Sequence, residues 1–221
     1  MEKRNRRRYY PTTPRQEPAP KNIKSRTIIF CKPYEVLSSF TDPEGRPSVG
    51  DYLCIPDVYA AGRLDYDSEG LLLLTSDGKL AHRITHPRHK LKKVYLVQVE
   101  NIPDQAALQQ LQQGVMVKGK LTRPAEVELL AEEPQLFERF PPIRSRNNIP
   151  TAWLKITLQE GRKRQVRRMT AAVGHPTLRL VRIAIGPITL ADLTPGQWRD
   201  LTRTELAALN ESLYQAKTIS S

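Results

Sequence analysis

The chain has 221 residues, of which 39% are hydrophobic, and its formal net charge is +12. No stretch approaches the roughly 18 consecutive apolar residues of a transmembrane helix, and no apolar segment follows the basic N-terminus as it would in a secretory signal. Its two cysteines, Cys31 and Cys54, are too few for a disulfide framework, so the sequence predicts a cytoplasmic protein.

The N-terminal segment is the most basic part of the chain. Residues 1–26 carry nine Lys and Arg but only two acids, with four prolines and almost no aliphatic side chains. Such a segment cannot bury enough apolar surface to fold alone, so we expect a disordered basic tail over residues 1–25 and one folded domain over residues 26–221. Because the tail lacks the apolar face of a membrane anchor, its predicted partner is RNA or DNA, bound through counterion release.

The rest of the chain reads as strands and helices in irregular order. We expect strands over residues 26–31, 58–60, 71–74, 92–100, 115–118, 125–130, 154–158, 177–183 and 197–201. We expect helices over residues 79–85, 101–114, 161–174 and 202–217. Since strands outnumber helices without regular alternation, this pattern predicts an α+β fold with a mixed, mostly antiparallel central sheet and flanking helices.

The stretch Gly62–Gly78, which reads GRLDYDSEGLLLLTSDG, combines a polar loop with a buried strand. Arg63 and Asp65 lie in the loop, and the four leucines that follow predict the strand. Asp65 is therefore a carboxylate at the edge of a packed core, where catalytic groups often lie. An ordinary solvated ion pair between Arg63 and Asp65 is the alternative.

The segment GRKRQVRRMTAAVG at residues 161–174 predicts a basic helix. At 100° per residue, Arg164 and Arg168 lie opposite the apolar face, and Arg167 lies at its flank. Residues 161–183 contain seven Lys and Arg and no acid, which favours an anionic ligand over a solvated surface of mixed charge. From its position Arg167 could reach Asp65 and hold that carboxylate ionised.

Five segments, in this order, resemble the pseudouridine synthases that modify ribosomal RNA, the group of small-subunit synthase A and large-subunit synthases B, E and F. They are KPYEVLSSF at Lys32, the stretch at Gly62, KVY at Lys93, EGRKRQVRRM at Glu160 and LRLVRIAIGP at Leu178. The run before Met169 is most similar to the synthase E branch. The S4 RNA-binding domain common in the family is not expected here.

The resemblance implies an isomerase that converts a uridine of ribosomal RNA, most simply 23S, to pseudouridine. It implies that Asp65, Tyr95 and Arg167 are catalytic, and that no cofactor or metal is needed. The residues implied to contact substrate or RNA are Arg63, Leu180, Lys32, Arg164, Arg168 and Lys163. It further implies that the protein acts as a monomer.

Two positions depart from the family pattern and other functions compete with this one. Glu35 stands where members often have Gly, and Lys163 where they often have Asn. A non-catalytic RNA-binding assembly factor would explain the charge but not an Asp in a Leu-rich motif. A methyltransferase would need a glycine-rich cofactor loop, and the histidines at positions 82, 86 and 89 lack nearby Cys or acidic partners for a metal.

Overall fold

The computed structural model describes residues 25–89, 91–143 and 149–218, so the predicted tail lies outside the described residues apart from position 25. The strands are β1 (Thr27–Lys32), β2 (Tyr59–Ala60), β3 (Glu69–Thr75), β4 (Lys93–Glu100), β5 (Met116–Val117), β6 (Lys120–Leu121), β7 (Glu126–Leu129), β8 (Thr151–Leu158), β9 (Thr177–Ile185), β10 (Ile188–Thr189) and β11 (Trp198–Asp200). The helices are the short 3-10 helix η2 (Val49–Asp51) and α1 (Gly78–Thr85), α2 (Gln105–Gln113), α3 (Gln165–Ala172) and α4 (Arg203–Thr218).

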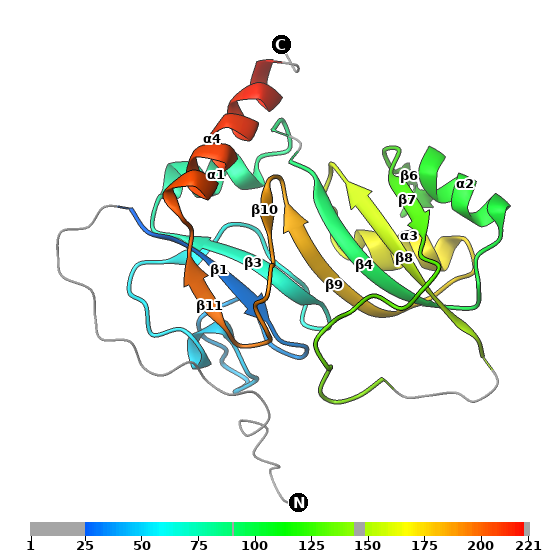
Figure 1. The fold of residues 1–221 in the computed structure, drawn as a ribbon, viewed down its shortest axis with the longest axis horizontal. Helices are drawn as coiled ribbons and strands as arrows, with labels where there is room; N and C mark the ends of the chain where they lie inside the picture. The colour runs from blue at the N-terminus through cyan, green and yellow to red at the C-terminus, as the bar shows by residue number, and fades with distance from the viewer. Residues whose placement is uncertain (1–24, 90, 144–148, 219–221) are drawn as a thin grey trace, which may run out of the picture.

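One large sheet organises the molecule (Figure 1). Its main order is β11-β1-β3-β9-β4-β8-β7, while β2 and β10 pair at the sides with β3 and β9. Every pairing within it is antiparallel except that of β3 with β9, which is parallel. The predicted α+β class with a mixed, mostly antiparallel sheet is therefore confirmed.

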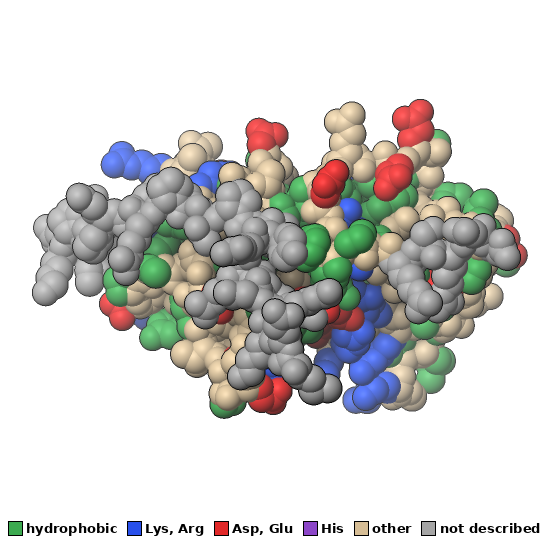
Figure 2. All heavy atoms as spheres, turned by 90° about the horizontal axis from the view of Figure 1, so that it is seen from below, with side chains coloured by type: hydrophobic (Ala, Val, Ile, Leu, Met, Phe, Trp, Pro, Cys, Tyr) green, Lys and Arg blue, Asp and Glu red, His purple; other side chains and the backbone are tan. Residues whose placement is uncertain are grey.

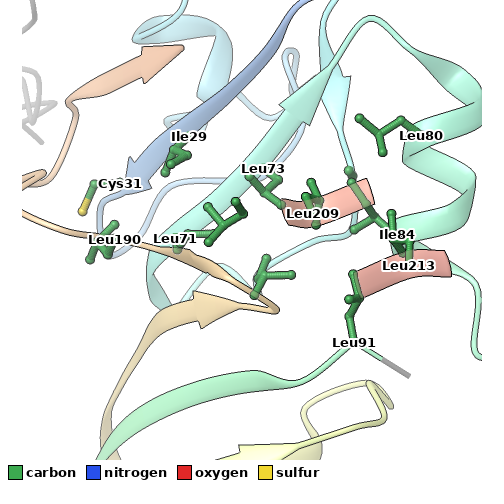
Figure 3. Close-up of a cluster of buried hydrophobic side chains, with 13 residues drawn as sticks. Ile29, Cys31, Leu71, Leu73, Leu80, Ile84, Leu91, Leu190, Leu209 and Leu213 are labelled. Carbon is green, nitrogen blue, oxygen red and sulfur yellow. The ribbon is translucent and has the colours of Figure 1, made fainter. Parts of the chain in front are cut away.

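The first half of the sheet, around β1 and β3, is buried on both faces. All residues of these two strands are buried, which explains why β3 carries consecutive leucines rather than an alternating pattern. One face packs against α1 and α4 through Leu73, Ile84 and Leu213 (Figure 3). The other face packs against the segment around η2 through Leu72 and Val49. This half is thus a rigid support for the loop before β3.

The second half of the sheet, formed by β4, β8 and β9, packs one face against α2 and α3. Val97 and Val99 of β4 lie there with Leu111 of α2 and Met169 of α3, all buried. Val97 and Val99 are two residues apart on β4 and therefore share this face. Helix α3 is thereby fixed at one side of the sheet, close to the end of β4 that carries Tyr95.

The two halves meet where β3 runs parallel to β9. Gly70 of β3 lies opposite Arg182 of β9, and its φ of +96° is one that L residues rarely adopt. A Cβ at this position would lie 2.4 Å from the carbonyl oxygen of Arg182. The close approach of the two strands therefore requires glycine, the first residue of the GLLLL run.

Some element boundaries differ from the sequence prediction. Helix α3 begins at Gln165 rather than at Gly161, because Arg164 adopts a left-handed conformation with φ +54° that ends helical geometry on its N-terminal side. The short strands β6 and β10 were not predicted. Each is two residues long, too short to show a hydrophobic period.

Glu35 also has a left-handed backbone, with φ +54°. Non-glycine residues adopt this conformation rarely, which accounts physically for the Gly that family members often carry there. Both cysteines are free, with Cys31 buried and Cys54 exposed. In the part of the chain that the structure describes, no helix is long and apolar enough to cross a membrane.

Candidate active site

A pocket of about 500 Å³ lies where the loop before β3 approaches β4, β9 and the start of α3. Seven Lys and Arg residues line it, against two acids, so its electrostatic character is positive. Figure 2 shows Lys and Arg side chains gathered in one patch on the face of the molecule that is seen from below. A pocket with this charge is suited to a ligand that carries phosphate groups.

Asp65 lines this pocket from the loop, and its side chain is half-buried. The loop is fixed on both sides of Asp65. Leu64 is buried, and its backbone N–H donates to Ser38 Oγ at 3.1 Å while the Ser38 hydroxyl donates to the Leu64 carbonyl at 2.8 Å. The Ser68 N–H donates to the Asp65 carbonyl at 3.0 Å, which closes a tight turn. These bonds present the carboxylate in a defined place.

Tyr95 and Leu180 form part of the pocket wall. Tyr95 belongs to β4 and Leu180 to β9, both are at least nine-tenths buried, and both line the same pocket as Asp65. Tyr95 pairs with Arg182 in the β4–β9 register, next to the pair of Val97 with Leu180. A flat ring and an aliphatic side chain beside a carboxylate make a site that accepts a planar base.

Arg167 contacts Asp67 rather than Asp65, which corrects the predicted contact. Its Nη2 donates to the Asp67 carbonyl at 2.6 Å and its Nη1 to the Thr177 carbonyl at 3.1 Å. Its Nε lies 3.2 Å from Asp67 Oδ2, an ion pair without hydrogen-bond geometry. The tight turn at residues 65–68 directs Asp67 toward α3 and leaves Asp65 on the pocket side.

Arg164 completes this cluster. Its Nη1 and Nη2 donate to the two carboxylate oxygens of Asp67, both at 2.8 Å. This bidentate bond couples the start of α3 to the loop before β3. Arg164 also lines the pocket, whereas Arg167 lies outside its lining.

The charges of the cluster favour the ionised form of Asp67. Burial opposes ionisation, but the hydrogen bond from Arg164 and the charge of Arg167 hold the pKa of Asp67 below its usual value. Burial lowers the pKa of Arg167, and Asp67 opposes that shift most strongly. The pKa of Arg164 is raised mainly by its hydrogen bond to Asp67 and, to a smaller extent, by the charge of Asp65. The charge of Asp65 also acts to raise the pKa of Arg167. Asp65 thus lies within electrostatic reach of Arg164 and Arg167, although among the described residues it forms no ion pair.

Lys32, which the resemblance placed at the RNA, is fully buried and cannot contact it. Its Nζ donates to the carbonyls of Pro33 at 2.8 Å and Val36 at 2.6 Å and lies 3.5 Å from that of Tyr66. Burial lowers the pKa of Lys32 to about 7, and the charge of Glu69 partly offsets this. Lys32 therefore joins the turn after β1 to the loop that carries Asp65.

The remaining predicted contacts lie near the mouth of the pocket. Arg63 and Lys163 are exposed and line it, so both are accessible to RNA. Arg168 is half-buried, lies outside the lining, and donates through Nη1 to the Lys163 carbonyl at 2.7 Å. The ring of His86 contacts that of His82 at a tilt and that of His89 edge-on, and no cluster of three or more potential metal ligands occurs within the described residues.

Several polar residues of the site were not predicted from the sequence, and three of them matter most for its charge. Asp67 is the acid that holds the two arginines, and Lys93 and Arg182 are cations in the pocket lining. Lys93 and Arg182 lie within quoted motifs, but a motif does not show which side chain faces a cavity. The only available signal for Asp67 was its position two residues after Asp65, close to a segment rich in arginine.

A positive pocket with a carboxylate, an aromatic ring and an aliphatic wall combines groups suited to a planar base and to phosphates, as a protein that acts on nucleic acid needs. A protein-family sequence model described as RNA pseudouridylate synthase matches residues 26–172, and the chain belongs to this family. The resemblance stated from its motifs is therefore confirmed.

Individual relatives support the same assignment. The chain is 56% identical over 175 residues to the ribosomal large subunit pseudouridine synthase E of Vibrio vulnificus, covering 79% of this chain and 74% of that protein. It is 57% identical over 174 residues to the protein of the same name from Xanthomonas campestris, covering 78% and 93%. A crystal structure of a pseudouridylate synthase matches with a TM-score of 0.71 and 30% identity, covering 84% of this chain and 74% of the other. The similarity to the synthase E branch is confirmed, as is the pseudouridine synthase fold.

Proposed function

We propose that the protein isomerises a specific uridine of large-subunit ribosomal RNA to pseudouridine, with Asp65 as the catalytic carboxylate. The observation that carries this proposal is the position of Asp65. It lines a positive pocket together with Tyr95 and Leu180, while the nearby Asp67 forms the ion pairs with Arg164 and Arg167. A carboxyl group that lines a pocket without an ion-pair partner among the described residues is available to a substrate.

The reaction requires the target base to leave the RNA stack. A base inside a duplex cannot reach a pocket, so it is flipped out or lies in a single strand. We assign Tyr95 to stacking on the uracil, Leu180 to the opposing wall, and Arg63 to the space that the flipped base leaves. Arg164 and Lys163 at the pocket, and Arg168 beside it, are suited to bind phosphates.

The chemistry needs no redox step and no added group. The N1–C1′ bond breaks, the uracil turns, and C5 bonds to C1′. The proton on C5 leaves and N1 gains one, so the product is an isomer of the substrate. Asp65 is placed to stabilise or bind C1′ during this exchange. We therefore assign no cofactor, and treat residues 26–221 as one catalytic domain that acts as a monomer.

The large-subunit substrate rests on the names of the relatives, both called ribosomal large subunit pseudouridine synthase E. A substrate of that kind is consistent with a cytoplasmic enzyme. The target nucleotide is to be found by mapping pseudouridine in ribosomal RNA from cells with and without the gene.

Asp65→Asn tests the proposal. We expect the rate of pseudouridine formation in ribosomal RNA from deletion cells to fall by on the order of 10⁴-fold, the effect of removing one member of a catalytic unit. RNA affinity should stay within about twofold, since the carboxylate is not a phosphate contact. Asp200→Asn is the control. Asp200 lies on β11, outside the pocket lining, and forms an exposed ion pair with Arg26. Pseudouridine formation by Asp65→Asn at the wild-type rate would leave only a cationic RNA-binding protein.

A further inference from the structure

Arg182 of β9 is a buried cation whose side chain is incompletely bonded. It is 4% exposed, yet it belongs to the pocket lining. Its Nε donates to the Leu71 carbonyl at 2.8 Å, whereas its buried Nη2 has no hydrogen-bond partner among the described residues. A buried donor left without an acceptor is costly and is rare in folded proteins. Because Arg182 also lines the pocket, an acceptor that enters the pocket approaches its guanidinium group.

The strand register places Arg182 next to the pocket wall already described. Tyr95 of β4 lies directly opposite Arg182, and Lys93 is two residues before Tyr95 on the same strand. Residues two apart on a strand share a face, and Lys93, Tyr95, Leu180 and Arg182 all line the same pocket. The two cations therefore lie on the face that carries the proposed stacking ring.

Neither cation is neutralised by an acid in the part of the chain that the structure describes. Lys93 Nζ donates to the Leu91 carbonyl at 2.9 Å, and within the described residues neither Lys93 nor Arg182 forms an ion pair with an acid. Burial, followed by the charge of Arg182, lowers the pKa of Lys93 to about 8. Two uncompensated cations so close together favour a ligand that carries or develops negative charge.

Arg179, three residues earlier on β9, shows what a fully paired arginine looks like in this strand. Its Nε and Nη2 each donate to a carboxylate oxygen of Glu69 at 3.0 Å, and its Nη2 also donates to the Phe137 carbonyl. Among the described residues, the fold thus provides an acid for Arg179 but none for Arg182. The difference indicates that the partner of Arg182 comes from outside the protein.

We propose that Arg182, assisted by Lys93, binds a carbonyl oxygen of the uracil and stabilises the charge that the ring acquires when the N1–C1′ bond breaks. This inference rests on the proposed function. In that step the bonding electron pair passes to N1 and is shared with the ring carbonyl oxygens, while C1′ becomes electron-poor beside Asp65. The charge disappears again when C5 bonds to C1′, C5 loses its proton and N1 gains one. Donors aimed at a developing oxyanion act mainly on the rate.

A base rather than a phosphate fits this position. Arg182 lies opposite the Tyr95 ring and is almost completely buried, so a stacked uracil brings its ring edge to the guanidinium. The phosphates of the RNA strand would bind the exposed cations at the pocket mouth, such as Arg63 and Lys163. Binding of a phosphate by Arg182 is the competing outcome that the experiment must separate.

Arg182→Met and Lys93→Met are compared with Lys92→Met as the matched control. Lys92 is adjacent in sequence, but it is exposed and paired with Glu126 at 2.6 Å, outside the pocket lining. The measurements are single-turnover tritium release from ribosomal RNA labelled at uridine C5, RNA affinity by filter binding, and melting temperature. For Arg182→Met we expect a rate loss of about 100-fold or more with RNA affinity within about twofold, because a lost oxyanion donor acts on the transition state. Lys93→Met should lose about tenfold and Lys92→Met nothing measurable.

A second substrate separates charge stabilisation from a structural role. Fluorine at C5 makes the detached base a weaker base, so its anion depends less on the guanidinium. The ratio of wild-type to Arg182→Met cleavage rates, measured by mass spectrometry of digested 5-fluorouridine RNA, should be several-fold smaller than for uridine RNA. Equal ratios on both substrates would overturn the proposal.

The other outcomes are also decisive. A wild-type rate in folded Arg182→Met, or a loss confined to RNA affinity, overturns the proposal, and the latter identifies a phosphate contact. If Arg182→Met does not fold, Arg182→Lys and Lys93→Met are measured instead on uridine RNA and 5-fluorouridine RNA, with the same expectation. Wild-type protein that forms no pseudouridine in any ribosomal RNA overturns the proposed function itself, which is a separate result.

Discussion

Asp65 and Asp67 lie two residues apart in one loop, and the fold treats them in opposite ways. Asp67 receives a bidentate bond from Arg164 and an ion pair from Arg167. Asp65 faces the pocket and, among the described residues, has no ion pair. The acid that holds the architecture together is therefore not the acid that is available to a substrate.

The same division extends to the strands below the loop. Behind the loop, buried charges are matched, since Glu69 binds Arg179 and the Lys32 ammonium is held by backbone carbonyls. In the pocket, Asp65, Lys93 and Arg182 have no charged partner within the described residues. Matched charges fix the positions of the unmatched ones, and a ligand can then supply what is missing.

Among the buried charges that have partners, Arg179→Met is expected to have the largest effect on stability. The substitution leaves the Glu69 carboxylate, of which 1% is exposed, without its guanidinium. We expect the free energy of unfolding to fall by about 3–5 kcal/mol, because an uncompensated buried charge is left behind. Urea denaturation followed by circular dichroism measures it.

Arg199→Met is the control for this prediction. Arg199 binds Glu205 in the same bidentate way, but its side chain is 34% exposed. Water replaces a lost partner there, so the expected cost is about 1 kcal/mol or less. Equal losses in the two variants would show that the matched charges below the loop are no more important than surface pairs.

Asp67→Asn is expected to have an intermediate effect on stability and a distinct effect on activity. Because Asp67 is half-buried, we expect a loss of about 2 kcal/mol, between the values for surface and buried pairs. Arg164 and Arg167 would then have Asp65 as the remaining acid within electrostatic reach, and pairing with it would occupy the catalytic carboxylate. The single-turnover rate should fall by about tenfold or more, as for a small misplacement of a catalytic group.

The comparison with Asp65→Asn makes this prediction sharper. That variant should lose activity with almost no loss of stability, whereas Asp67→Asn should lose both. Melting curves and single-turnover rates of the two proteins provide the four values needed. If Asp67→Asn kept full activity, the proposed division of roles between the two acids would be wrong.

Much of the fold was predictable because its signals are local. The leucines at residues 71–74 predicted a buried strand, and the strands expected over residues 71–74 and 92–100 were both found, as β3 and β4. The start of α3 was not, because nothing in the basic segment before Gln165 shows that Arg164 takes a left-handed backbone. Helix periodicity reports faces, and a single unusual φ does not alter it.

The site was predictable in its motif residues but not in its contacts. The motifs brought Asp65, Tyr95 and Leu180 to one pocket, although their roles remain proposals. Whether Arg167 meets position 65 or 67 depends on a four-residue turn, and whether Lys32 is exposed depends on how the loop folds over it. These are distances between segments far apart in the chain, and a sequence pattern does not measure them.

Lys32→Met tests how the buried Lys32 ammonium affects the pH dependence of stability, and it has the smallest expected effect. The ordinary pKa of this lysine is 10.5, and burial lowers it to about 7 in the folded protein. Above pH 7 the folded state therefore releases a proton that the unfolded state keeps until about pH 10.5. Since the unfolded state then binds more protons, the free energy of unfolding rises with pH.

We expect this rise to contribute about 1 kcal/mol between pH 7 and pH 8 in the wild-type protein and to be absent in Lys32→Met. Urea denaturation of both proteins at the two pH values measures it, and taking the difference cancels other titrating groups. Losing the carbonyl contacts of Lys32 also changes the free energy of unfolding by an amount that does not depend on pH. Only the change of that free energy with pH depends on the titration of Lys32. Parallel slopes in the two proteins would mean that Lys32 keeps its proton, and that the carbonyls around it, together with Glu69, offset its burial completely.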